Sequence, residues 1–233
     1  MEKDIFSLYG DGIGGVALIQ SMGDDLTIVN AARASLGKES TEMGEREQRL
    51  SNFLIRSGHT STMEHNYATF WIKVPLFVAR QQMRHRTFSY NEISRRYTSF
   101  DIEFYEPKAL RLQDTKNRQA SLDEVTNPEM VDGLFADQTI SRHVSDSMTL
   151  YDELIEKGIS REQARMVLPQ NIYTTYWATG SLHNWVNSFI AKRDHPDAQY
   201  EIRLLAQGIS TLLRDLWPIA HENLVKHGKI PAL

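Results

Sequence analysis

The richest chemistry in this sequence lies in one run of thirteen residues, from Arg84 to Arg96. Four arginines and a histidine stand in it, with serine, threonine and asparagine between them and a single carboxylate, Glu92. Guanidinium groups stay charged at any biological pH and offer paired donors that match phosphate oxygens. Ser89 and Ser94 are not in a nucleophile-elbow sequence, so hydrogen bonding to a ligand is the better interpretation. The run therefore predicts a site for a small phosphorylated molecule.

The overall composition restricts the class of ligand and the kinds of site that this chain can have. The formal net charge is −4, whereas bulk nucleic-acid binding favours a basic domain. The 233 residues contain no cysteine, which excludes thiolate metal sites and thiol nucleophiles from this chain. The first residues are charged and no apolar stretch is long enough to cross a membrane. We expect a cytoplasmic protein whose ligand is small, with neither nucleic acid nor membrane as a partner.

Two other patterns carry weaker signals. His59 and His65 are six residues apart and lack an obvious third ligand, so no metal site is predicted. The segment Gly10–Gly15 matches G-x-G-x-x-G, but too short a stretch follows it for the required helix. We interpret that segment as a glycine-rich turn between two strands.

The elements that position these residues can be outlined from periodicity. Residues 5–30 begin as strand, turn and strand, and residues 66–73 form an aromatic strand. Pro75 suits the first turn of a helix through Arg84, which would place Gln81, Arg84 and His85 on one face.

Helices dominate the rest of the chain. Residues 42–57 form a helix that ends at Gly58, and Ser160 opens a capping box for a helix that Pro169 ends. A helix over 197–217 contains Gly208, which indicates a close helix crossing. Residues 105–130 are expected to be an irregular surface excursion. Early strands and late helices predict one α+β domain over residues 1–233.

The run from Arg84 to Arg96 fits R-H-R-x-x-S-x-N-x-x-S-x-R at every specified position, and so resembles the signature of flavin-dependent thymidylate synthases. Segments around Ser61 and Glu64, over 161–169, and from Arg193 through 199–202 also look like family segments. The resemblance covers most of residues 30–220. It implies an α+β fold with a central, mainly antiparallel sheet flanked by helices and a helix-rich C-terminal half.

The resemblance also implies a reaction. A methylene group from 5,10-methylenetetrahydrofolate would pass to C5 of dUMP, with FAD as the redox cofactor and NADPH as the reductant that regenerates it. Because this chain has no cysteine to add to the uracil ring, fixed cations would have to activate that ring. The family's members are homotetramers with sites built from several subunits, so the site residues need not converge within one chain.

Site residues follow from the same resemblance, position by position. Arg193 matches the arginine that polarises the uracil and is the expected catalytic group. The expected dUMP contacts are Gln81, Gln82, Arg84, Glu92, Ser94, Arg95, Arg96, Arg165 and Arg193. The expected FAD contacts are His59, Ser61, Glu64, Arg84, His85, Arg86, Thr87, Glu92, His183, Asn184 and Ser188.

One segment departs from the family. Many members have Asn-x-Arg as a flavin contact where this chain has Leu182-His183-Asn184. Leucine has no side-chain hydrogen bond to give, so the contact is lost or is rebuilt through His183 or Asn184. Two alternatives to the family reaction remain: a nucleotide- or RNA-binding module with the arginine run as a phosphate clamp, and a same-fold methylase of another pyrimidine nucleotide.

Overall fold

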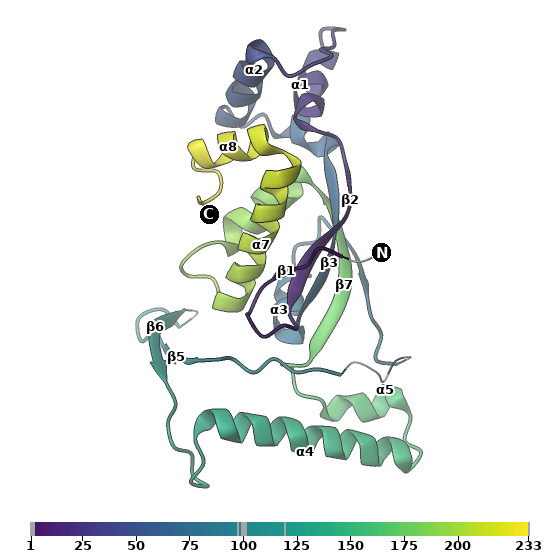
Figure 1. Cartoon of the computed structure of the whole chain (residues 1–233), viewed down its shortest axis with the longest axis vertical. Coiled ribbons are helices and arrows are strands. Elements are labelled where there is room, and N and C mark those ends of the chain that lie inside the picture. Colours follow the sequence, from purple (N-terminus) through teal and green to yellow (C-terminus); the bar gives the residue numbers. More distant parts are fainter. Residues whose placement is uncertain (1–2, 97, 99–101, 119, 233) are drawn as a thin grey trace.

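The computed structural model describes residues 3–96, 98, 102–118 and 120–232. Its centre is an antiparallel sheet with strand order β1-β2-β3-β7-β4 (Figure 1). The strands of this sheet are β1 (Phe6–Ser7), β2 (Gly15–Met22), β3 (Tyr67–Pro75), β7 (Tyr173–Ser181) and β4 (Ser89–Glu92). Together with the helices around it, this sheet confirms the expected α+β class.

The glycine-rich segment before β2 is a turn, as its sequence predicts. Asp11 Oδ1 accepts hydrogen bonds from the backbone N–H groups of Ile13 and Gly14, at 2.9 and 3.1 Å. Gly10 and Gly12 have positive φ angles, of 65° and 76°, which glycine adopts without steric cost. Strand β2 follows directly, so the segment is no dinucleotide-binding fingerprint.

Helices surround the sheet at its two ends and on one face (Figure 1). They are α1 (Asp25–Ala34), α2 (Glu45–Arg56), the short η1 (Thr60–His65), α3 (Leu76–Gln82), the π-helical η3 (Asn184–Ile190), α6 (Ala191–Arg193), α7 (Tyr200–Leu216) and α8 (Pro218–Lys226). Helix α2 ends before Gly58, whose φ of 72° confirms its predicted role. None of the helices in the described ranges combines the length and hydrophobicity that a bilayer crossing needs.

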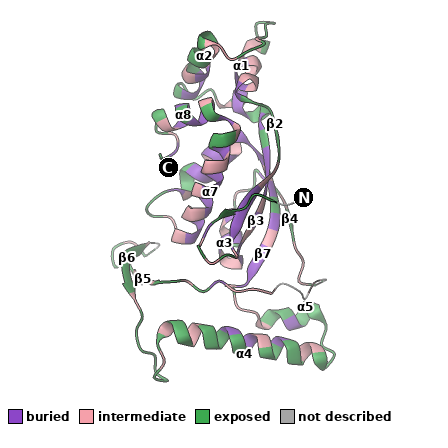
Figure 2. Cartoon of the chain, in the orientation of Figure 1, coloured by how far each residue is buried: buried purple, intermediate pink, exposed green. Residues whose placement is uncertain are grey.

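The core lies between the sheet and the pair α7 and η3. Phe70, Ile72 and Tyr176 from the strands are almost wholly buried, as are Ile202 and Leu205 from α7 (Figure 2). Gly208 permits this packing against β1 and β2, because a Cβ there would lie 2.9 Å from Leu8 Cδ2. The close approach predicted at Gly208 is therefore to strands, whereas we expected another helix.

Residues 105–130 differ from the expected irregular excursion. They contain an antiparallel hairpin, β5 (Leu110–Gln113) and β6 (Ser121–Thr126), with a register shift near Arg111. Short strands joined by an irregular pairing leave little periodic signal, which explains why the sequence did not indicate them. Strand β6 is largely exposed, which agrees with the expected surface position, whereas β5 is mostly half-buried (Figure 2).

A second layer crosses one end of the molecule. It holds α4 (Ala136–Glu156), α5 (Arg161–Ala164) and η2 (Arg165–Val167), and most of α4 is exposed (Figures 1 and 2). The capping box predicted at Ser160 is not formed, since its side chain makes no cap hydrogen bond. Residues 160–163 are exposed, so water can satisfy the N–H groups of this single turn.

Candidate active site

The arginine run begins where α3 stops. The helix ends at Gln82, so the predicted helix through Arg84 is too long, and Gln81, Arg84 and His85 do not share a helical face. The chain instead turns, with the His85 N–H donating to the Gln82 carbonyl at 2.9 Å, and enters β4 at Ser89. The first half of the run is thus a turn between a helix and an edge strand.

Two aromatic residues hold this turn against the core. The Phe88 ring is buried 4.4 Å from the Trp185 ring, and it occupies the space where a side chain on Gly180 would stand. The Tyr90 hydroxyl lies 2.9 Å from the Gln82 carbonyl oxygen and can donate to it. With these anchors buried, Arg84, Arg86 and Thr87 remain exposed at the surface.

Arg193 reaches the turn from the opposite direction. The buried η3 helix carries the chain through Trp185 and Phe189 to α6, whose last residue is Arg193. Arg193 Nε donates to His85 Nε2 at 3.0 Å, and its NH2 lies 3.5 Å from the Gln81 carbonyl oxygen. Two predicted site residues that are 108 positions apart thus meet within one chain.

Burial and the neighbouring cations determine the charge state of His85. Burial, followed by the positive charges of Arg193, Lys192 and Arg84, lowers the pKa of His85 to about 4. The imidazole is therefore neutral near pH 7 and can accept from Arg193. Burial and the nearby Arg84 lower the pKa of Arg193 as well, although a guanidinium stays protonated. The result is a fixed cation that a negatively charged ligand group would stabilise.

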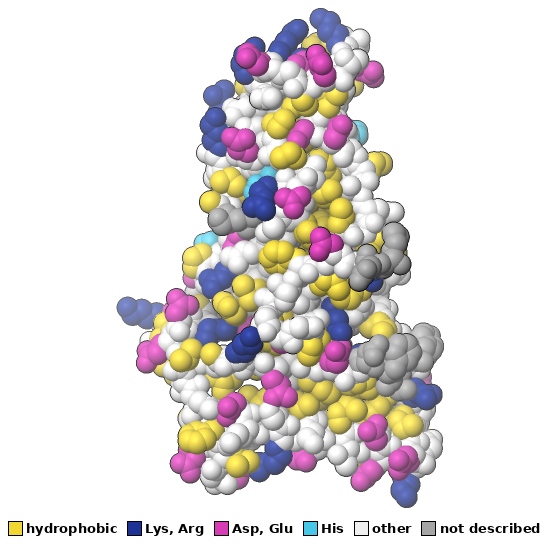
Figure 3. All heavy atoms as spheres, in the orientation of Figure 1, with side chains coloured by type: hydrophobic (Ala, Val, Ile, Leu, Met, Phe, Trp, Pro, Cys, Tyr) yellow, Lys and Arg dark blue, Asp and Glu magenta, His cyan; other side chains and the backbone are white. Residues whose placement is uncertain are grey.

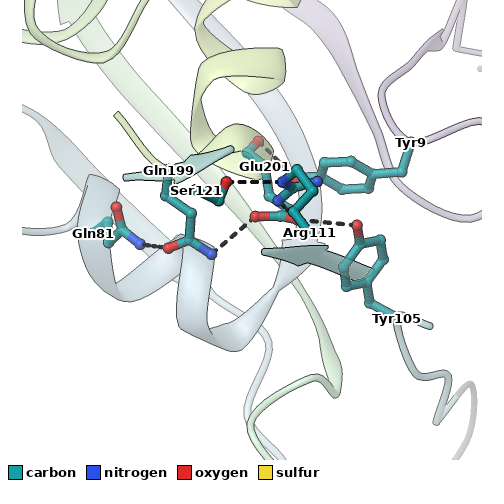
Figure 4. Close-up of polar contacts among 7 residues, drawn as sticks. All are labelled: Tyr9, Gln81, Tyr105, Arg111, Ser121, Gln199 and Glu201. Atoms are coloured by element: carbon teal, nitrogen blue, oxygen red, sulfur yellow. Dashed lines mark hydrogen bonds and ion pairs between the residues drawn. The ribbon is translucent and has the colours of Figure 1, made fainter. Parts of the chain in front are cut away.

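A chain of side chains continues from this point into the protein (Figure 4). The Gln81 side chain donates to Gln199 Oε1, and Gln199 Nε2 donates to Glu201 Oε2 at 2.9 Å. Glu201 is buried and forms an ion pair with Arg111 of β5 at 2.8 Å. We call Gln81, His85, Arg193, Gln199 and Glu201 the inner cluster.

A second group of polar residues surrounds a pocket of about 420 Å³. Thr174 Oγ1 donates to Glu92 Oε1 at 2.6 Å, and Arg95 NH2 lies 3.4 Å from the Tyr173 carbonyl oxygen. The members of this outer cluster, from β4, the segment after it, α5 and η2, are Glu92, Arg95, Arg96, Glu162 and Arg165. Ser94 accepts from the Arg96 N–H at 3.3 Å and therefore shapes the turn beside the cluster.

The two clusters draw on different elements of the chain. The inner cluster comes from α3, the turn after it, α6, the residue before α7 and the first turn of α7, whereas the outer cluster comes from β4, the segment after it, α5 and η2. The predicted nucleotide contacts therefore form two groups, one around Arg193 and one around the pocket of about 420 Å³.

Most of the predicted flavin contacts lie on segments that adjoin the end of β7, whereas His85 and Glu92 belong to the two clusters above. His59, Ser61 and Glu64 are exposed on and beside η1. The segment after β7 touches both neighbours, because the Leu182 N–H donates to the Asn66 carbonyl at 2.8 Å and Asn184 Nδ2 donates to the Thr87 carbonyl at 2.8 Å. Three segments that are distant in sequence thus adjoin one another.

In segment 182–188, which differs from the family pattern, most side chains contact other parts of the protein. Leu182 is 1 % exposed and packs in the core, so this position offers a ligand nothing. His183 Nδ1 lies 2.9 Å from Asn187 Nδ2, and the Asn184 amide holds the arginine turn. Ser188 is partly exposed, and its backbone carbonyl accepts from the His85 ring.

The predicted nucleotide contact of Gln82 does not fit its position. Its side chain is fully buried and its Oε1 accepts from the Tyr176 hydroxyl. Gln82 therefore supports the strand beneath the turn. Conversely, Gln199, Glu201, Arg111 and Thr174 belong to the clusters or contact them but were not expected there. Gln199 and Glu201 stand in a segment that resembles the family, which is the signal that would have found them.

Comparison with known proteins identifies a single family. A family model described as thymidylate synthase complementing protein (Thy1) matches residues 17–219. A flavin-dependent thymidylate synthase of Thermus thermophilus is 42% identical over 214 residues, covering 92% of this chain and 76% of that protein. The enzyme of the same name from Thermotoga neapolitana is 39% identical over 214 residues, covering 92% of both chains.

Solved structures agree with the sequence comparison. A UMP/dUMP methylase, PolB from Streptomyces cacaoi, bound with 5-Br UMP, superposes with a TM-score of 0.79 at 29% identity. The match covers 99% of this chain and 98% of that one. The same protein bound with 5-Br dUMP gives a TM-score of 0.78. The fold and most of the sequence therefore match together.

Proposed function

The chain belongs to the flavin-dependent thymidylate synthase family, and we propose that it methylates C5 of dUMP to form dTMP. The observation that carries this proposal is the Arg193 guanidinium, which lies beside neutral His85 and Gln81 at the turn of the arginine run. The proposed carbon donor is 5,10-methylenetetrahydrofolate and the proposed reductant is NADPH. FAD, when bound, supplies the reducing equivalents that complete the methyl group.

Activation of the uracil falls to cations. This chain has no cysteine, so a thiolate cannot add to the ring. Arg193 uses Nε for His85 and keeps further N–H donors for a uracil oxygen. Because burial removes water from around Arg193, its charge stabilises an anionic ring more strongly than an exposed arginine would. Arg193 is the proposed catalytic residue.

The outer cluster suits the nucleotide phosphate. Arg95 and Arg165 line the pocket of about 420 Å³ and Arg96 lies beside it. Guanidinium forks match phosphate oxygens in pairs. Glu92 lines the same pocket and its carboxylate can accept from a hydroxyl of the sugar. The inner cluster would then hold the base.

The donor chemistry near the end of β7 fits FAD. Arg84 and Arg86 are exposed cations, and Thr87, Ser61 and His59 add neutral donors, a set that suits a pyrophosphate. Glu64, His183, Asn184 and Ser188 lie on the adjoining segments, and the remaining proposed FAD contacts are His85 and Glu92. The Asn184 bond to the Thr87 carbonyl fixes one edge of this surface.

We further propose a homotetramer whose sites combine the inner cluster of one subunit with groups from others. The family resemblance supports this, because it implies homotetramers whose sites are built from several subunits. Light scattering of the purified protein tests it, since a stable active monomer would contradict the proposal.

A second candidate function is methylation of UMP. The similarity to a protein described as a UMP/dUMP methylase favours it, at 29% identity over nearly the whole chain. Competition between UMP and dUMP for the same protein discriminates the two. An RNA-binding module is disfavoured, since Lys and Arg are interspersed with Asp and Glu on the face shown in Figure 3.

The visible absorption spectrum tests the proposed function. We expect yellow protein, or protein that turns yellow with added FAD, that oxidises NADPH faster when dUMP is present and produces dTMP. Protein that binds neither FAD nor dUMP would overturn the proposal and favour a binding module.

A further inference from the structure

The inner cluster contains a buried carboxylate that has no place in the reaction described so far. Glu201 is 4% exposed and stands in the first turn of α7. Its Oε1 accepts from Arg111 NH2 at 2.8 Å and from the Tyr105 hydroxyl at 3.2 Å. Its Oε2 accepts from Gln199 Nε2 at 2.9 Å. Paired with Arg111, Glu201 is an ionised group that only accepts hydrogen bonds.

That fixed acceptor determines how the Gln199 amide is oriented. A glutamine amide has a donor end and an acceptor end that are nearly the same shape, so either end can face a neutral partner. Against a carboxylate only the NH2 end is favourable. Gln199 must therefore present Nε2 to Glu201 and Oε1 to its other neighbour.

The orientation of the Gln199 amide in turn determines that of the Gln81 amide. Because Gln199 offers an oxygen, Gln81 must answer with Nε2, and this is the bond that forms. Figure 4 shows the Gln81 oxygen turned away from Gln199. The buried Glu201 carboxylate thus fixes the orientation of two amides in succession, Gln199 and then Gln81. As a result the Gln81 side-chain oxygen remains available as an acceptor, on the same residue whose backbone carbonyl contacts Arg193.

Further contacts fix Arg111 and the backbone of Glu201 in place. The Arg111 guanidinium lies 4.2 Å from the centre of the Tyr200 ring, and its Nε donates to Ser121 at 3.0 Å. The Tyr9 hydroxyl donates to the Glu201 carbonyl at 3.3 Å. Arg111 of β5, itself held by Ser121 of β6, thus fixes the Glu201 carboxylate, and Tyr9 fixes the backbone of the same residue at the start of α7.

We propose that Glu201 is a positioning residue for the nucleotide site: through Gln199 it makes Gln81 present its carbonyl oxygen to the substrate. This inference rests on the proposed function. An outward oxygen accepts from an N–H or O–H of the nucleotide, whereas an amide turned the other way would meet that donor with a donor. The relay therefore contributes to affinity for the nucleotide without touching it.

Calorimetric titration of FAD-loaded protein with dUMP tests the relay. Gln199→Leu removes it and leaves the Glu201–Arg111 pair in place, so we expect dUMP to bind about five- to tenfold more weakly, consistent with one lost hydrogen bond. Gln81→Ala should weaken binding by a similar factor. The double variant should bind no more weakly than Gln81→Ala alone, because both changes remove the same contact. Gln48→Leu, the same change on exposed α2, is the control and should leave affinity unchanged.

A merely structural role gives a different pattern. In that case Gln199→Leu would lower the melting temperature but leave dUMP affinity within about twofold, or its effect would add fully to that of Gln81→Ala; either result overturns the proposal. If Gln199→Leu does not fold, Glu201→Gln replaces it, since its amide can turn either end to Gln199, and the same non-additivity with Gln81→Ala is expected. Wild-type holoenzyme that fails to bind dUMP would instead contradict the proposed function.

Discussion

The inner and outer clusters hold similar side chains in opposite surroundings. In the inner cluster His85, Arg193 and Gln199 are partly buried, Glu201 is buried, and each is joined to a protein partner within 3.5 Å. In the outer cluster Arg96 and Glu162 are 50% and 57% exposed and 3.6 Å apart. Exposed pairs of this kind are screened by water and contribute less than about 1 kcal/mol.

This difference implies a division of work. Preorganised, partly desolvated cations act on charge that develops during a reaction, because no reorganisation is needed at that moment. Hydrated cations on an open pocket attract an anion and help to hold it. We therefore expect loss of the inner cation, Arg193, to affect turnover and loss of an outer cation to affect binding, whereas the inner amides Gln81 and Gln199 act on nucleotide affinity.

The largest effect is expected from Arg193→Ala. Removing this guanidinium takes away the proposed stabilisation of the anionic ring, so kcat for dTMP formation should fall about a hundredfold or more. Circular dichroism should show a folded protein, because Arg193 is only partly buried. A kcat within a few-fold of the wild type would remove Arg193 from its catalytic role.

Arg165→Ala tests the other side of the comparison. Arg165 is exposed at the rim of the outer pocket, so its loss should raise the KM for dUMP about tenfold and leave kcat within about twofold. The salt dependence of KM should also become shallower, since one screened charge is gone. A large fall in kcat with unchanged KM would break the proposed division.

A pH titration of stability examines the Arg193–His85 contact. The pKa of His85 lies near 4 in the folded protein and near 6.5 as a free side chain, so the unfolded chain takes up a proton between these values that the folded chain does not. Stability from this group is complete above pH 6.5 and is lost as the pH falls towards 4. The melting temperature should therefore fall more steeply over this range in wild type than in His85→Gln. His221, whose pKa burial also lowers, is present in both proteins. Parallel curves would show that His85 is not held neutral.

The smallest effect is expected at Glu162. Glu162→Gln removes a negative charge beside Arg96, so dUMP should bind up to about threefold more tightly at low salt, with kcat unchanged. Titrations at two salt concentrations measure this. Weaker binding would indicate that Glu162 orders Arg96 for the substrate.

Sequence reasoning located the inner and outer clusters unevenly. Strands β2 and β3 and the end of α2 follow from alternation and from Gly58, since those signals are local. The central strand β7 was missed, because that part of the chain was expected to be dominated by helices. The meeting of Arg193 with His85 was not predicted. The family resemblance named both as site residues but allowed them to come from different subunits, and composition says nothing of their distance across 108 residues. Gln82 stands beside the motif, but its side chain is buried and accepts from the Tyr176 hydroxyl, so its nucleotide contact stays a prediction.

The resemblance could have drawn attention to Gln199 and Glu201, but neither it nor the sequence pattern could predict the hydrogen bonds that link them to Gln81. The chemistry of this relay depends on which end of an amide faces a carboxylate, and that becomes visible only when Arg111 from a surface hairpin meets Glu201 from α7. A hairpin with a register shift and short strands gives no periodic pattern to predict. Long-range polar networks of this kind are fixed by tertiary packing.

The flavin requirement of dTMP formation tests the central claim most directly. The protein would be freed of FAD, supplied with dUMP, 5,10-methylenetetrahydrofolate and NADPH, and assayed for dTMP before and after FAD is restored. Because this chain offers cations and no thiolate to activate the ring, we predict no dTMP above background without FAD and recovery with it. Undiminished dTMP formation by rigorously flavin-free protein would contradict the account.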